Sequence, residues 1–122
     1  MGLLFIETTG GQIPTLADAQ GFVEVANSPQ ATGAGTAGTR LTVFWARATS
    51  TAMAGPTITG PTDHAYARII TYRGAMNSGN PWDVTGGGVK GGASTSVTVT
   101  GVTTTVANTR IVQAVARDND ST

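Results

Sequence analysis

The hydrophobic positions of this chain come in short runs that alternate with polar positions, and glycine-rich breaks separate the runs. Alternation at every second residue is typical of strands that are half-buried in a sheet. Together with the continuous apolar run at residues 3–6, it predicts six strands, over residues 3–7, 22–25, 40–49, 65–73, 94–100 and 110–117. No stretch of ten or more residues repeats with the period of a helix, although residues 15–20 could form one helical turn.

The alternation is strongest over residues 40–49, where both faces of the expected strand carry an aromatic side chain. Trp45 falls on one face and Phe44 on the other, so this strand is expected in the centre of a sheet covered on both sides. Short strands between Gly/Pro turns predict an all-β fold. We expect an antiparallel β-sandwich or jelly roll, with two long glycine-rich loops at 26–39 and 74–92.

Composition narrows the class of protein without naming a function. The 122 residues predict a single β-sandwich domain, 1–122, and they include 22 Thr, 17 Gly and 17 Ala. Seven basic residues balance seven acidic ones and only 11% of residues are charged, so a basic nucleic-acid-binding face is excluded. The absence of cysteine excludes a disulfide scaffold, a thiol enzyme and a cysteine-ligated zinc site.

A glycine motif at residues 33–38 fits the Gly-x-Gly-x-x-Gly pattern of dinucleotide sites. Such a site needs a strand before the motif and a helix after it, so that the pyrophosphate meets the helix N-terminus. Here Pro29 precedes the motif and an expected strand follows it. A chance match is expected in a chain with 17 glycines, so no cofactor is predicted.

The chain has few of the residue types that catalysis or metal binding requires. His64 is the single histidine, and no serine lies in the Gly-x-Ser-x-Gly turn of a hydrolase triad. One histidine without cysteine also makes a poor zinc set. We expect Asp63 and His64 to cap the turn that enters the strand at 65–73. Residues 118–122 start like a calcium loop and lack its later ligands, which favours a polar terminus. The prediction is a protein that is not an enzyme and holds no metal.

One candidate binding feature lies in the second glycine-rich loop, where Asn80, Trp82 and Asp83 follow one another around Pro81. A tryptophan exposed on a loop offers a stacking platform for a sugar or a protein partner. The alternative is a tryptophan that folds back and closes the end of a thin sandwich. Sequence favours the second interpretation and leaves the first open.

Several strings of residues resemble a group of bacteriophage virion-associated proteins, described mostly as tail or structural proteins. They are Phe-Val-Glu-Val-Ala-Asn-Ser-Pro-Gln at 22–30, Thr-Arg-Leu-Thr-Val-Phe-Trp at 39–45, Asp-His at 63–64, Arg-Ile-Ile-Thr-Tyr-Arg-Gly at 68–74, Gly-Asn-Pro-Trp-Asp-Val-Thr at 79–85 and Thr-Thr-Thr-Val-Ala-Asn-Thr at 103–109. The resemblance spans about residues 21–117. It implies a β-sandwich on the outside of a phage particle and carries over no catalytic residue.

The resemblance has one departure, because sequences of this group usually continue with further strands beyond the position of Asp120. Either the sandwich here is minimal, or the chain is a fragment, or neighbouring chains supply the missing strands. Unpaired edges of a sheet favour the addition of a strand from a partner.

These observations predict a structural protein of the virion, on the exterior of the capsid or tail, that assembles with copies of itself and other virion proteins. The alternative function is a glycan- or receptor-binding module of a phage tail that uses the Trp82 loop on a host surface glycan. Neither function involves nucleic acid, a membrane or a cofactor. A hydrolase is disfavoured by the single histidine and the missing cysteine.

Overall fold

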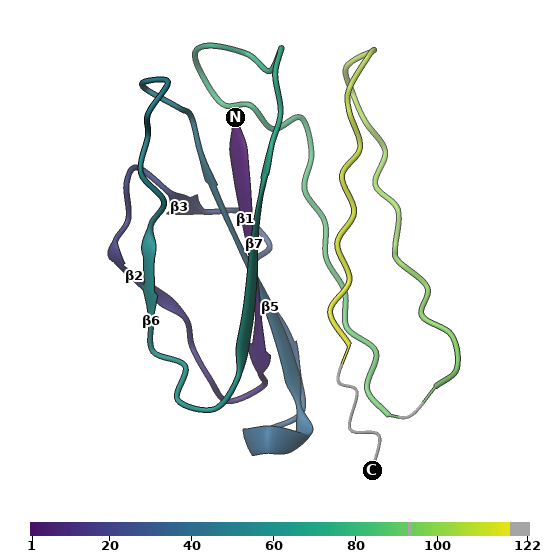
Figure 1. Ribbon diagram of the computed structural model, residues 1–122. Coiled ribbons are helices and arrows are strands. Elements are labelled where there is room, and N and C mark those ends of the chain that lie inside the picture. Colours follow the sequence, from purple (N-terminus) through teal and green to yellow (C-terminus); the bar gives the residue numbers. More distant parts are fainter. Residues whose placement is uncertain (93, 118–122) are drawn as a thin grey trace.

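The computed structural model describes residues 1–92 and 94–117, and it is all-β with antiparallel sheets, consistent with the predicted β-sandwich (Figure 1). The larger sheet has five strands: β3 (Val23–Glu24), β5 (Thr39–Ala46), β1 (Gly2–Thr9) and β7 (Ala65–Thr71) in that order, with β4 (Gln30–Thr32) also paired to β5. The smaller sheet pairs β2 (Thr15–Asp18) with β6 (Thr57–Thr59). A short 3₁₀ turn, η1, spans Gly35–Ala37.

Strand β5 lies in the interior of the larger sheet, as its sequence predicted. It pairs with β1 along its whole length, from Thr39 opposite Thr9 to Ala46 opposite Gly2, and with β3 and β4 on its other side. The strand predictions over residues 3–7, 22–25 and 65–73 are also confirmed, with shifts of a few residues at their ends. Alternating β-branched and aromatic residues suit these pleated surfaces.

The hydrophobic core lies between one face of the larger sheet and the two-stranded sheet. Leu4 and Ile6 of β1 point to this side and are almost fully buried. The buried cluster consists of Leu4, Ile6, Phe22, Phe44 and Ala46, and Leu16, Met53 and Ile58 pack against it from the other layer. The opposite face of the sheet carries Leu3, which is equally buried, together with Phe5, Val43 and Trp45. Both faces are therefore apolar.

The predicted helical turn at residues 15–20 is wrong, because Thr15–Asp18 forms strand β2. Its partner β6 was also missed, since Thr57–Thr59 sits between two Gly-Pro pairs that read as one loop. A six-residue helix makes few hydrogen bonds, whereas pairing with β6 gives Thr15, Leu16 and Asp18 partners and sets Leu16 opposite Ile58 over the core. The Thr15 and Thr59 hydroxyls add a hydrogen bond of 3.0 Å across the pair.

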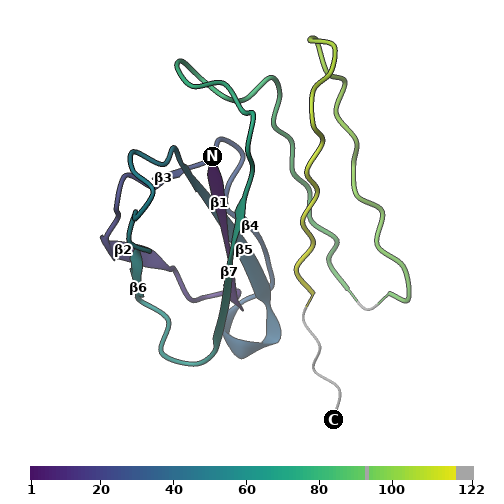
Figure 2. The ribbon, with the colours of Figure 1, turned by 45° about the horizontal axis from the view of Figure 1, so that its top comes forward.

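The part of the chain after Thr71 differs from the prediction in its hydrogen bonding. It runs as long extended segments beside the larger sheet (Figures 1 and 2), yet no strand is assigned to its described residues. The strands predicted at 94–100 and 110–117 are therefore wrong for a single chain. Their alternating sequences supply a strand pattern, but a strand also needs a hydrogen-bonded neighbour.

The structure agrees with one of the two predicted glycine-rich loops and differs from the other. Residues 26–39 contain β4 and η1, so the first is not one long loop, whereas the described residues of 74–92 hold neither helix nor strand. The jelly-roll topology stays a prediction, and the calcium-like residues 118–122 lie outside the described part of the chain. None of the described residues form a helix with the length and hydropathy that a membrane crossing requires.

Candidate functional site

Trp82, the central residue of the predicted binding loop, packs on the apolar face of the larger sheet. Its ring meets the Trp45 ring edge-on, with centroids 5.9 Å apart and an interplanar angle of 87°. This T-shaped geometry places the positive edge of one ring against the negative face of the other. Trp82 is half-buried, and its indole Nε1 is buried without a hydrogen-bond partner among the described residues. The placement fits the interpretation of a tryptophan folded back onto the sandwich.

Arg47 holds the loop that precedes Trp82, and sequence reasoning missed it. Its guanidinium lies 5.6 Å from the centroid of the Trp45 ring, a cation–π arrangement. Its Nε donates to the carbonyl oxygen of Met76 at 3.1 Å, and its Nη2 donates to that of Gly79 at 3.2 Å. Alternation along β5 was the available signal, because Trp45 and Arg47 are two residues apart and share a face.

Asn80 and Asp83 use their side chains within the chain. The Asn80 Oδ1 accepts a hydrogen bond of 3.1 Å from the backbone N–H of Trp82, which is an Asx turn. Asp83 accepts hydrogen bonds from the Thr105 hydroxyl, from the Thr105 N–H at 2.8 Å and from the Val106 N–H at 3.2 Å. The side-chain bond from Thr105, then the backbone bonds, hold the pKa of Asp83 below its usual value, partly offset by desolvation.

A second clamp fastens the same segment to the loop before β4. The Asn27 Nδ2 donates to the carbonyl oxygen of Thr85 at 3.0 Å and to its hydroxyl at 2.9 Å. Asn27 has a φ of 64°, a left-handed conformation that asparagine tolerates better than most residues. The predicted residues Asn80, Trp82 and Asp83 thus sit in one loop that is anchored at several points. Their role as ligand contacts stays a prediction.

His64 lies between two carboxylates at the start of β7. Its Nε2 is 3.6 Å from Glu7 Oε1 and its Nδ1 is 3.8 Å from Asp63 Oδ2. Glu7 in turn accepts a hydrogen bond of 3.1 Å from the Thr39 hydroxyl. Among the described residues no backbone N–H bonds the Asp63 carboxylate, so the expected capping turn is not formed. The side chains of His64 and Asp63 are about half exposed or more, so this contact lies at the surface, where such pairs contribute little to stability.

The glycine motif at 33–38 connects β4 to β5, with η1 between them. A strand follows it as predicted, but β4 also precedes it, which was not expected from the sequence; the motif lacks the helix N-terminus that a pyrophosphate needs. Close packing explains two of its glycines: a Cβ on Gly38 would collide with the carbonyl oxygen of Thr32, and Gly33 has a φ of +72°. These glycines serve a tight connection in the backbone.

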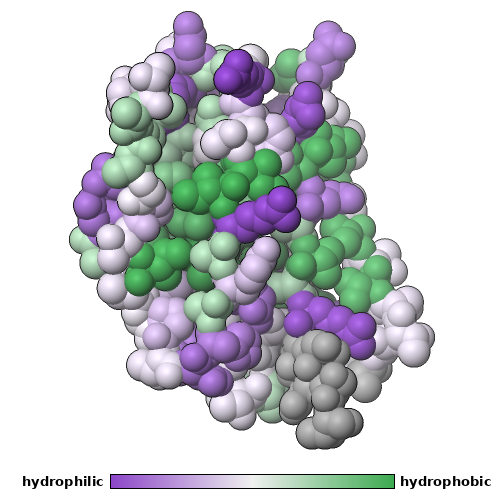
Figure 3. All heavy atoms as spheres, in the orientation of Figure 1, coloured by the Kyte–Doolittle hydropathy of each residue, from purple (hydrophilic) through white to green (hydrophobic). Residues whose placement is uncertain are grey.

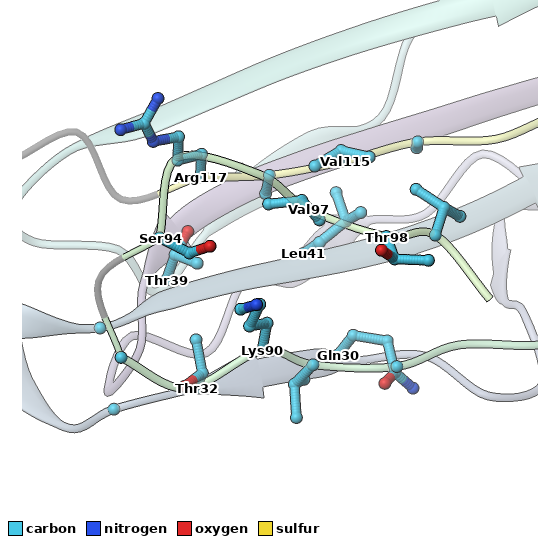
Figure 4. Close-up of a pocket in the computed structure, with 18 of the residues that line it drawn as sticks. Gln30, Thr32, Thr39, Leu41, Lys90, Ser94, Val97, Thr98, Val115 and Arg117 are labelled. Atoms are coloured by element: carbon cyan, nitrogen blue, oxygen red, sulfur yellow. The ribbon is translucent and has the colours of Figure 1, made fainter.

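Two cavities separate the larger sheet from the extended segments. One has a volume of about 690 Å³ and reaches from Phe5 and Val43 on the sheet to Trp82 and Ile111. The other, of about 1110 Å³, is lined by hydroxyl and amide side chains from both layers, such as those of Thr32, Thr39, Ser94, Thr98 and Gln30 (Figure 4). Both spaces are open to solvent, so the side chains of the two layers are not in full contact.

The larger cavity has a basic rim. Lys90, the single lysine, lines it together with Arg117, and no carboxylate is found among its described lining residues. Lys90 lies among the lining side chains, whereas the Arg117 guanidinium points away from them (Figure 4). Both residues are exposed, so the rim is open to solvent.

No family model, no curated protein and no solved structure matches this chain.

Proposed function

We propose that this protein is a non-enzymatic structural protein of a bacteriophage virion, which builds or decorates the exterior of the capsid or tail by packing of sheets from several copies. The virion assignment rests on the sequence resemblance over residues 21–117. The observation that carries the assembly role is the state of the chain after Thr71. There the sequence alternates as in strands, while the described residues have no ladder.

The exposed apolar side chains of this region support the assembly role. Those with at least 37% exposure are Met76, Val89, Val97, Val99, Val102, Val106, Ile111, Val112 and Val115. Burial of apolar surface contributes about 25 cal/mol per Å², so a surface that removes these side chains from water stabilises the complex. Unpaired extended backbone beside them gains hydrogen bonds when a further strand is added.

Charge supports the same mode of association. A net charge of zero gives little long-range steering, so assembly depends on contact between apolar and hydrogen-bonding groups. Thr-rich strands and small residues suit such contacts, because they leave a flat surface with hydroxyl groups.

The location is tested by purifying phage particles from cells that express the gene in the course of infection. We expect the protein to band with the particles in a density gradient at a constant ratio to the major capsid protein. Gold-labelled antibodies should mark the outside of intact particles. Recovery of the protein from the cell lysate alone, with none on the particles, would contradict the proposal.

A glycan- or receptor-binding role for the Trp82 loop is the second candidate. It is suggested by the part of the Trp82 side chain that stays accessible, since the ring is only half-buried against Trp45. A glycan array should show binding by the wild type, loss in Trp82→Ala and retention in Val89→Ala, a change at an exposed residue of the same loop. Absence of sugar binding at millimolar concentration would eliminate this candidate.

A further inference from the structure

Strand β7 is an edge of the larger sheet and has β1 as its neighbour on one side. No strand lies on its other side in the part of the chain that the structure describes. In Figure 1 β7 stands in front of β1 and β5, and the surface in the same orientation shows apolar side chains separated by hydrophilic ones (Figure 3). Two of the exposed apolar residues, Tyr66 (63%) and Ile69 (42%), belong to β7.

The hydrogen bonds at the end of β7 show which backbone groups face outward. The Tyr72 N–H donates to the Met1 carbonyl oxygen at 2.7 Å, and the Met1 amino group donates to the Tyr72 carbonyl oxygen at 2.9 Å. This exchange makes Tyr72 and Met1 a hydrogen-bonded pair. Such pairs alternate along an antiparallel ladder, so Tyr66, Arg68 and Ile70 direct their backbone groups toward β1.

The remaining residues of β7 therefore direct their N–H and C=O groups away from the sheet. They are Ala65, Ala67, Ile69 and Thr71. This row of donors and acceptors along an exposed edge is a template for another strand.

We propose that β7 pairs antiparallel with β7 of a second copy, about a twofold axis at Ala67, and joins two five-stranded sheets into one. The inference deepens the proposed function, because it rests on assembly from several copies and names the surface that pairs. Main-chain hydrogen bonds across the axis would join Ala67 to Ala67 of the second copy, and Ala65 to Ile69 of the second copy.

Side-chain pairing favours this register over the one with its axis at Arg68. With the axis at Ala67, Tyr66 lies opposite Arg68 of the second copy, and the symmetry repeats this contact of an aromatic ring with a cation. An axis one residue later would set the two Arg68 side chains directly opposite each other, which is repulsive. Beyond the strand ends, the chosen register brings Asp63 near Arg73 of the second copy, an approach of opposite charges.

A second β7 fits this edge better than the extended segment at 110–117 of another copy. That segment carries two cations, Arg110 and Arg117, and no acidic residue, whereas β7 carries one cation, Arg68, which the chosen register places opposite Tyr66. Arg110 also has a place within its own chain, because its guanidinium lies 5.8 Å from the centroid of the Tyr72 ring.

The first experiment measures the mass of the full chain in solution by light scattering. Ala67→Pro removes an outward N–H and leaves the bonds to β1, since proline is tolerated on an edge strand. We expect the wild type to have an even number of chains and Ala67→Pro to have half that mass. Ala67→Ser keeps the N–H and should keep the wild-type mass. A wild-type monomer, or equal masses of wild type and Ala67→Pro, would overturn the proposal.

The second experiment uses the wild-type protein and so does not depend on a variant folding. Hydrogen exchange should show the outward amides of Ala67 and Ile69 protected to the same order as the inward amides of Arg68 and Ile70, and protection of the outward set should be lost on dilution. Fast exchange of the outward set in the oligomer would overturn β7 pairing. Protection of the outward amides in an assembly of three chains would also overturn it. In such a ring β7 would pair with the segment at 110–117 of another copy.

The two proposals fail separately. If Ala67→Pro leaves the mass unchanged while the protein is still found on phage particles, β7 pairing is wrong and the virion role stands. If Ala67→Pro halves the mass while the wild type is absent from particles, the pairing stands and the virion role is wrong.

Discussion

The parts of this chain before and after Thr71 have similar strand-like sequences but differ in how far their strands are paired and buried. Up to Thr71 the strands have hydrogen-bonded partners, and Leu4 and Ile6 are about 1% exposed or less. After Thr71 the described residues are extended without a ladder, and Ile111 is 65% exposed. The difference shows that alternation specifies a strand conformation, whereas a stable strand also needs a neighbour that satisfies its backbone and covers its apolar face.

The largest expected effect is the loss of stability when one isoleucine is truncated in the paired part of the chain, compared with the same change after Thr71. Ile6→Ala should lower the free energy of unfolding by about 3 kcal/mol, because it leaves a cavity in a fully buried site. Ile111→Ala, the matched change at a position that is exposed in the single chain, should cost under about 0.5 kcal/mol at a protein concentration where the chain is monomeric. Urea unfolding at one fixed protein concentration measures both. Similar losses for the two variants would mean that Ile111 is buried in solution.

The next effect concerns the contact that joins the two parts. Trp82→Ala removes the edge-on contact with Trp45 and should cost about 1–2 kcal/mol, of which the aromatic pair contributes about 1 kcal/mol. A double-mutant cycle with Trp45→Ala isolates the pair term in urea unfolding. Additive losses would show that the two rings do not interact in solution and that the loop is not anchored there.

The sequence predicted the elements that depend on local pattern and missed those that depend on a distant partner. A continuous apolar run located β1, and alternation located β5 and β7, because each of these strands has at least seven residues. Strands β2 and β6 are short and become strands by pairing with each other, so neither carries a signal alone. The reverse error occurred at 94–100 and 110–117, where a clear alternation has no ladder among the described residues.

The candidate site was predictable to a similar extent. The sequence singled out Trp82 as an aromatic residue in a glycine-rich loop, which is a local feature. It gave no indication that Arg47 bonds the carbonyl groups of Met76 and Gly79, or that Asp83 bonds Thr105, because these contacts join residues that are far apart along the chain. Residue type shows what a side chain can bond, and the fold decides which partner it meets.

A smaller effect tests the clamp between Asp83 and the turn at Thr105. The lowered pKa of Asp83 means that the folded chain favours the charged carboxylate. The resulting stabilisation is present above the usual value of 3.8 and is lost as the pH falls through the lowered pKa. We expect the amide protons of Thr105 and Val106 to lose protection from exchange in this acidic range.

Asp83→Asn is the control for that titration, because the amide keeps an acceptor oxygen and has no charge to lose. Its Thr105 and Val106 amides should exchange faster than those of the wild type near neutral pH and should respond less to acid. A wild-type protection that stays constant down to about pH 2 would show that the clamp does not depend on the charge of Asp83.

The smallest expected effect is that of salt on assembly. A chain without net charge, whose exposed residues after Thr71 are largely apolar or hydroxyl-bearing, should associate through contacts that ions screen weakly. Light scattering should therefore give the same mass between about 0.05 and about 0.5 M sodium chloride. A mass that falls over this range would instead make the charged groups at the ends of β7, Asp63 and Arg73, the dominant contacts. In that case the apolar segments after Thr71 would remain exposed in the assembly, and a different partner would be needed to cover them.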